Sequence, residues 1–143
     1  MTAVSYLEFR ALPGAPFWAR RQTRAALQEW KFRREEIETA ELMVSELVTN
    51  AVKFIGPRPA HASDRELACA ELISLTLRCL SDRLIIEVSD PDPRPPLLTE
   101  PAADAESGRG LMLVQILSKE WNHYPCPTGG KVVYCVLATA PGT

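Results

Sequence analysis

The sequence lacks a long hydrophobic run, an export signal and an excess of basic residues. No window approaches the roughly 18 apolar residues that a membrane span needs, and the first residues, MTAVSYLEFRALPG, do not join a basic region to an apolar one. The 143 residues include 16 basic and 18 acidic side chains, which gives a net charge of -2. This balance is not typical of proteins that bind nucleic acid or anionic membranes. We therefore expect a cytoplasmic protein without a direct nucleic-acid or membrane partner.

Patterns of metal binding and disulfide formation are missing as well. The four cysteines fall at no metal-ligand spacing, and the missing export signal argues against disulfides. They are Cys69, Cys79, Cys126 and Cys135, and we expect them to be buried thiols. The two histidines are His61, in a loop, and His123, beside Trp121. For both, a surface or strand-edge role is more frequent than phosphotransfer.

The size and composition of the chain favour one compact unit. No internal repeat and no coiled-coil heptad pattern is present, and 46% of the residues are apolar. A chain of this length commonly forms one hydrophobic core. We therefore expect residues 1–143 to form a single domain.

The first half of the sequence predicts a strand followed by two helices. Residues 4–9 have the pattern of a short strand, and prolines separate it from a helix over residues 17–30, with Trp18, Ala25, Leu27 and Trp30 on its buried side. Residues 33–55 give the strongest helical signal. Its apolar residues recur at spacings of three and four: Ile37, Ala40, Val44, Leu47, Val48, Ala51 and Ile55.

The second half predicts two hairpins on either side of a long loop and a short helix. Strands are expected over residues 71–80 and 84–90, joined by a tight turn, and again near residues 121–126 and 131–137. Between the hairpins, PDPRPPLLTEPAADAES is too rich in proline for regular structure, and SGRG opens a helix over residues 111–117. This order predicts an α+β fold: a two-layer sandwich with a mostly antiparallel mixed sheet and helices on one face.

Three polar residues of the long helix are candidates for chemistry. Glu46, Asn50 and Lys53 fall on one stripe, roughly opposite the apolar stripe. Such a stripe is most often a solvated face. In the functional interpretation, Asn50 supplies an oxygen ligand to Mg²⁺, which needs few protein ligands, and Glu46 acts as a base or positions a water molecule.

Two further positions have a structural and a functional interpretation. Asp90 ends the strand LIIEVSD, where a carboxylate commonly caps a turn but could also accept a hydrogen bond from the exocyclic amine of adenine. Gly108 and Gly110 bracket Arg109 at a helix start, where backbone N–H groups can approach a phosphate. The same glycines could equally form a loop hinge.

Four blocks of the sequence, in this order, resemble one known superfamily. They are SELVTNAVKF, VSDPDPRPP, ESGRGLMLVQILSKEW and GGKVVYCVL. Together they resemble the Bergerat-fold, or histidine kinase/gyrase-like, ATPases, and most closely the bacterial anti-sigma-factor serine/threonine protein kinases. The similarity extends over nearly the whole chain.

The resemblance implies a role for each candidate residue, with ATP and Mg²⁺ as cofactors. Asn50 would ligate Mg²⁺, Glu46 would be the general base, and Lys53 would lie near the phosphates. Asp90 would accept the adenine amine, and residues 91–107 would form a lid over the nucleotide. The phosphate-side loop and helix start would consist of Gly108, Arg109, Gly110 and Leu111.

The resemblance also implies partners: a sigma factor, an antagonist protein that the kinase phosphorylates, and a second copy of the chain in a homodimer.

Two departures from the family pattern leave a non-catalytic adaptor open as the alternative. Family members commonly carry glycines two and four positions after the adenine-binding Asp, where this sequence has Asp92 and Arg94. A threonine is usual near the final strand pair, where this sequence has Val132, with Thr128 upstream. A detached histidine-kinase domain is less favoured because no helix with a phosphoacceptor histidine precedes the fold.

Overall fold

The computed structural model describes residues 2–55, 71–96, 109–127 and 129–139. The sequence forms regular elements wherever its apolar pattern is periodic. In chain order they are β1 (Ala3–Arg10), α1 (Ala15–Glu29), α2 (Arg34–Ile55), β2 (Leu72–Cys79), β3 (Arg83–Asp90), α4 (Arg109–Leu117), β4 (Glu120–Pro125) and β5 (Lys131–Ala138). Each predicted strand and helix is present, with boundaries that differ by at most two residues from the expected ones.

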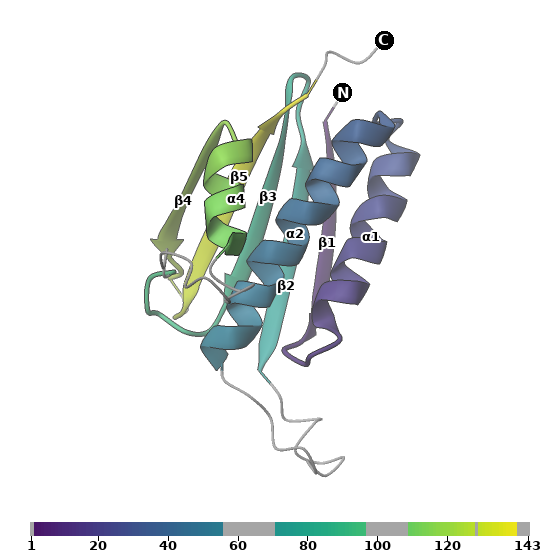
Figure 1. Ribbon diagram of the computed structural model, residues 1–143. Helices are drawn as coiled ribbons and strands as arrows, with labels where there is room; N and C mark the ends of the chain where they lie inside the picture. Colours follow the sequence, from purple (N-terminus) through teal and green to yellow (C-terminus); the bar gives the residue numbers. More distant parts are fainter. Residues whose placement is uncertain (1, 56–70, 97–108, 128, 140–143) are drawn as a thin grey trace.

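The five strands form one sheet in the order β1-β2-β3-β5-β4. Helices α1, α2 and α4 cover one face of it (Figure 1). The predicted two-layer α+β sandwich is therefore confirmed. One detail differs from the expectation of a mixed sheet, because all four strand pairings in the described part of the chain are antiparallel.

The core lies between the sheet and α2. The apolar stripe predicted for this helix is buried at Ile37, Ala40, Val44, Leu47, Val48 and Ala51, whereas the side chain of Ile55 lies outside the described residues. Alternate residues of β2 and β3 face this stripe and are buried as well. The opposite face of the sheet is more polar, with an ion pair between Arg78 and Glu87 at 2.7 Å.

Helix α1 is oriented differently from the sequence prediction. Trp18 is 58% exposed and Ala25 is exposed, although both were expected on the buried side. The helix instead buries Leu27 and a row of small residues: Ala15, Ala19, Thr23 and Ala26. Small side chains at this spacing let two helices approach closely, and α1 packs along α2. Leu27 was predicted correctly, and Trp30 is partly buried against the core.

The connection between α1 and α2 is a tight turn with one unusual backbone conformation. The N–H of Phe32 donates to the carbonyl of Leu27 at 3.0 Å, and Lys31 has φ of +64°. Such a left-handed residue after a helix normally favours glycine. The side chain of Lys31 is exposed, so packing does not explain why lysine occupies this position.

The described cysteines agree with the expectation of thiols. Cys79 and Cys135 are buried free thiols, Cys126 is half-buried, and Cys69 lies outside the described residues. Burial raises the pKa of Cys135 to about 12. Among the described helices, none is long and apolar enough to cross a membrane. The exposed His123 lies on β4, and His61 lies outside the described residues.

Candidate functional site

Three segments that carry predicted site residues meet the start of β5 at one end of the molecule. Figure 1 shows the end of α2, the end of β3, the start of α4 and the start of β5 at the lower end of the drawing. The antiparallel pairing of β3 with β5 explains part of this arrangement, because it places Asp90 directly opposite Lys131. Helix α4 packs against α2 on the same side of the sheet.

Asp90 is the centre of the best-defined part of the site. It is 3% exposed, and its Oδ1 atom accepts two hydrogen bonds, from the backbone N–H of Asp92 at 2.8 Å and from Nζ of Lys131 at 3.1 Å. Lys131 is 1% exposed and also donates to the backbone carbonyl of Asp92 at 3.0 Å. Lys131 thus links the end of β3 and the residues after it to the start of β5.

The second carboxylate oxygen of Asp90, Oδ2, is buried and has no hydrogen-bond partner among the described residues. An unsatisfied buried acceptor is costly, so this atom requires a donor beyond the described residues, such as a water molecule or a ligand amine. Burial raises the pKa of Asp90, while the Asp92 amide and the Lys131 ammonium act in the opposite direction. The unpaired acceptor oxygen of Asp90 therefore fits a donating adenine amine at this position.

Gly130 brings β5 unusually close to Asp90. It has φ of +85°, and a Cβ atom at this position would lie 2.1 Å from the backbone oxygen of Asp90 and 2.8 Å from Cα of Pro91. No other residue fits there without displacing the backbone. Gly129, with φ of +100°, completes the turn between β4 and β5.

Asp92 and Arg94 occupy the two positions where the family commonly has glycine. Neither has a positive φ, because Lys31 is the only non-glycine residue in the described part of the chain that does. The backbone therefore does not need glycine here. Instead, the Arg94 guanidinium pairs with the Asp92 carboxylate at 2.5 Å and holds the pKa of Asp92 at about 2.

The predicted residues of α2 lie at the border of its buried stripe. Glu46 and Asn50 are half-buried, and Lys53 is exposed. The first two therefore flank the core rather than lie opposite it. Burial raises the pKa of Glu46, and the positive charge of Lys53 counteracts this effect.

The polar groups near α2 fit Mg²⁺ better than a metal that needs a protein cage. The described residues contain no group of three or more His, Cys, Asp or Glu side chains that could hold a metal ion. Mg²⁺ keeps several water and phosphate ligands, so the amide oxygen of Asn50 is sufficient as the protein ligand.

Helix α4 begins at Arg109, close to the predicted start, with Gly110 in its first turn. Gly108, the side chains of Arg109 and Leu111, and residues 97–107 of the expected lid lie outside the described residues, as does Thr128. Val132 is buried on β5 and offers no hydroxyl.

Lys131 and Gly130 are the site residues that the sequence interpretation missed. Residues 131–137 were assigned as a strand, and Lys131 received no role. One signal was available: lysine opens an otherwise apolar strand directly after two glycines, and lysine is rarely found buried unless it is paired.

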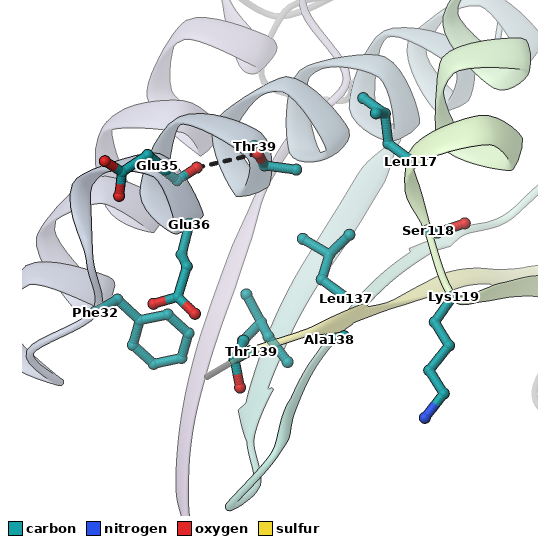
Figure 2. A pocket seen from close by; sticks show the side chains of 11 residues that line it. Phe32, Glu35, Glu36, Thr39, Leu117, Ser118, Lys119, Leu137, Ala138 and Thr139 are labelled. Carbon is teal, nitrogen blue, oxygen red and sulfur yellow. Dashed lines mark hydrogen bonds between the residues drawn. The ribbon is translucent and has the colours of Figure 1, made fainter. Parts of the chain in front are cut away.

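One pocket lined by described residues is separate from this site. It has a volume of about 370 Å³ and lies at the opposite end of α2, between the start of that helix, the end of α4 and the end of β5. Figure 2 shows Phe32, Leu117 and Leu137 along its apolar part, with Glu36 near Phe32. None of the predicted site residues lines it.

Comparison with known families identifies the fold. A family model described as the histidine kinase-like ATPase domain matches residues 9–136. The chain belongs to the histidine kinase-like ATPase family. Members of this family bind ATP, usually with Mg²⁺. The match includes Glu46, Asn50, Asp90 and the start of α4.

A solved structure has the same fold as this histidine kinase-like ATPase. It is the crystal structure of the RsbU and RsbW domains of Rv1364c from Mycobacterium tuberculosis, with a TM-score of 0.62 and 18% sequence identity. The alignment covers 98% of this chain and 34% of the other, so this chain spans about a third of that protein's length. No curated protein sequence matches the chain.

Proposed function

We propose that this histidine kinase-like ATPase is an anti-sigma factor that phosphorylates a serine or threonine of an antagonist protein. The observation that carries the proposal is Asp90, a buried carboxylate with one unpaired oxygen at the end of β3. Family membership supports ATP binding, and the structural match to a chain with an RsbW domain supports a regulatory role.

Nucleotide binding is proposed to combine Asp90 with the end of α2 and the start of α4. The Oδ2 atom of Asp90 accepts a hydrogen bond from the exocyclic amine of adenine, and its partner Lys131 keeps Oδ1 occupied. The helix start at Arg109 and Gly110 offers backbone N–H groups to the phosphates. Asn50 would hold Mg²⁺, which neutralises phosphate charge when bound.

Glu46 is proposed as the general base of the transfer. The hydroxyl oxygen of the antagonist forms a bond to the γ-phosphorus of ATP, the bond from that phosphorus to the β-phosphate oxygen breaks, and the hydroxyl proton passes to the Glu46 carboxylate. ADP and the phosphorylated antagonist are the products. Because burial raises the pKa of Glu46, its carboxylate is a better base than an exposed glutamate.

A second candidate function is a non-catalytic adaptor that acts by contact alone. The Asp92–Arg94 ion pair favours it, because two charged side chains stand beside Asp90 where the family commonly has glycine. Such side chains reduce the room for an adenine ring. The adaptor would bind nucleotide weakly or not at all and would transfer no phosphate.

Nucleotide calorimetry with one matched variant pair tests the binding step. Asp90→Asn removes the charge of the acceptor, and Asp82→Asn removes an exposed carboxylate in the turn at the other end of β3. We expect Asp90→Asn to weaken ATP binding at least tenfold, the scale of a lost hydrogen bond to a charged group, and Asp82→Asn to behave as the wild type. Equal affinities for both variants would exclude Asp90 as the adenine acceptor.

Phosphate transfer separates the kinase from the adaptor. The protein is purified from its native cytosol with bound partners, and labelled ATP is added with Mg²⁺. Label on a serine or threonine of a partner supports the kinase. A wild type that binds ATP but labels none of its partners supports the adaptor.

A further inference from the structure

The positive charge of Lys131 is enclosed in the middle of the candidate site. Lys131 is 1% exposed and is the first residue of β5, whose other residues are mostly apolar. Removing an ammonium group from water is costly unless it is paired and hydrogen-bonded. Lys131 obtains this compensation from the Asp90 carboxylate at 3.1 Å and from the Asp92 carbonyl at 3.0 Å.

The two hydrogen bonds to Asp90 are unevenly distributed over its carboxylate. Both the Asp92 N–H and the Lys131 ammonium donate to Oδ1, and none of the described residues donates to Oδ2. The carboxylate is therefore held from one side, and its free oxygen is fixed in place. An ion pair whose only task was to connect β3 and β5 would not require a buried, unsatisfied oxygen.

We infer that Lys131 is a positioning residue of the nucleotide site: it holds Asp90 as an ionised acceptor whose Oδ2 atom is kept for the exocyclic amine of the base. This inference rests on the proposed adenine contact of Asp90. Lys131 itself does not touch the ligand. It determines which kind of base Asp90 selects, because an ionised carboxylate accepts from an amino group and repels a carbonyl oxygen.

Two charged side chains near Asp90 change its pKa through their charges, and they act in opposite directions. Burial raises the pKa of Asp90, the charge of Lys131 on β5 lowers it, and the charge of Asp92 raises it. Arg94 holds the pKa of Asp92 at about 2, so Asp92 stays ionised at any pH near neutrality. Loss of Lys131 therefore raises the pKa of Asp90 further. Once protonated, Asp90 can donate to a 6-oxo group.

The experiment compares ADP with inosine diphosphate, which carries a 6-oxo group in place of the amine. Binding of both is measured by calorimetry from about pH 6 to about pH 8.5 for the wild type and Lys131→Met, which removes the charge but keeps the length of the side chain. We expect the wild type to bind ADP more tightly than inosine diphosphate, by a factor that stays nearly constant over this pH range. In Lys131→Met this preference should fall about tenfold for each unit of pH below the raised pKa of Asp90.

Lys119→Met is the control, because Lys119 is exposed and lines the pocket at the opposite end of α2. It should follow the wild type. Equal base preference in the wild type and in a folded Lys131→Met protein, at every pH, overturns the inference.

A second measurement covers the case in which Lys131→Met does not fold. The carboxyl carbon resonance of Asp90 is followed by NMR in the wild type as the pH is changed. We expect an ionised carboxylate at neutral pH, and a protonated Asp90 at neutral pH overturns the inference. A wild type that binds neither nucleotide removes the proposed function, whereas the NMR titration still decides the charge state that Lys131 is inferred to maintain.

Discussion

Glu46 combines half-burial with a nearby positive charge on the same helix. Burial raises its pKa and Lys53 counteracts this, so the carboxylate remains able to accept a proton from a hydroxyl group. Glu46→Gln keeps the shape of the side chain and removes the base. We expect phosphate transfer to the antagonist to fall about a hundredfold or more, with ADP affinity almost unchanged.

The matched control is Glu38→Gln, on the same helix but exposed and paired with Arg34. It should leave transfer at the wild-type rate, since exposed ion pairs contribute little. Single-turnover transfer of labelled phosphate measures both variants. Equal rates for Glu46→Gln and the wild type would remove the base assignment.

The residues of the candidate site differ in how well they can be predicted from the sequence. Asp90 could be found because it ends a regular strand, and Glu46 and Asn50 because helical spacing places them together. Lys131 could not be found in the same way. Lysine is usually solvent-exposed, and only the register of β3 on β5, set by pairing between distant segments, shows that it faces Asp90.

At the level of elements, the turn between α1 and α2 offers a test of backbone strain. Lys31 has φ of +64° and an exposed side chain. A residue with a Cβ atom pays about 1 kcal/mol or more for this conformation, whereas glycine does not. Lys31→Gly should therefore raise the free energy of unfolding by roughly 1 kcal/mol, measured by urea denaturation.

Gln28→Gly is the comparison variant, because Gln28 is exposed in the last turn of α1, which precedes Lys31. There glycine should lower the free energy of unfolding by up to about 1 kcal/mol. A loss of stability in both variants would show that the Lys31 conformation is not strained in solution.

The orientation of α1 shows a limit of reasoning from residue type. Trp18 was expected on the buried side of this helix, yet it is exposed and packs edge-on against Phe17, with ring centroids 5.3 Å apart. The distance between α1 and α2 determines the outcome. A close approach selects the face with alanines, and the spacing between two packed helices cannot be obtained from the pattern of one helix.

For the whole molecule, we predict a homodimer that uses β1. This strand lies at one edge of the sheet, and its outward residues Val4 and Tyr6 are each 60% exposed. Exposed edge strands are commonly paired or covered. Light scattering should give twice the chain mass of 15.9 kDa.

Tyr6→Lys should shift the protein toward the monomer, because a charge on the contact opposes pairing. Tyr124→Lys, at the other edge strand, β4, is the control. A wild type that remains monomeric at high concentration contradicts the dimer and leaves the fold unaffected.

The architecture of the whole molecule was only partly visible in the sequence. The order of elements and the layer arrangement follow from local periodicity and from the proline-rich breaks. The position of β5 between β3 and β4 does not, because it depends on contacts between strands that are separated by α4. This strand order is what brings Lys131 and Gly130 against Asp90.

The tight turn between β2 and β3 offers a place for attachment. Its Ser81 and Asp82 are exposed, and its backbone is closed by a hydrogen bond from Leu80 N–H to the carbonyl of Arg83 at 2.9 Å. Asp90 is the last of the eight residues of β3, so it lies roughly 26 Å from Asp82 at about 3.3 Å per residue. A fluorophore or surface tether placed here would leave the candidate site facing the solution. Immobilised molecules could then be assayed one at a time for ligand and partner capture.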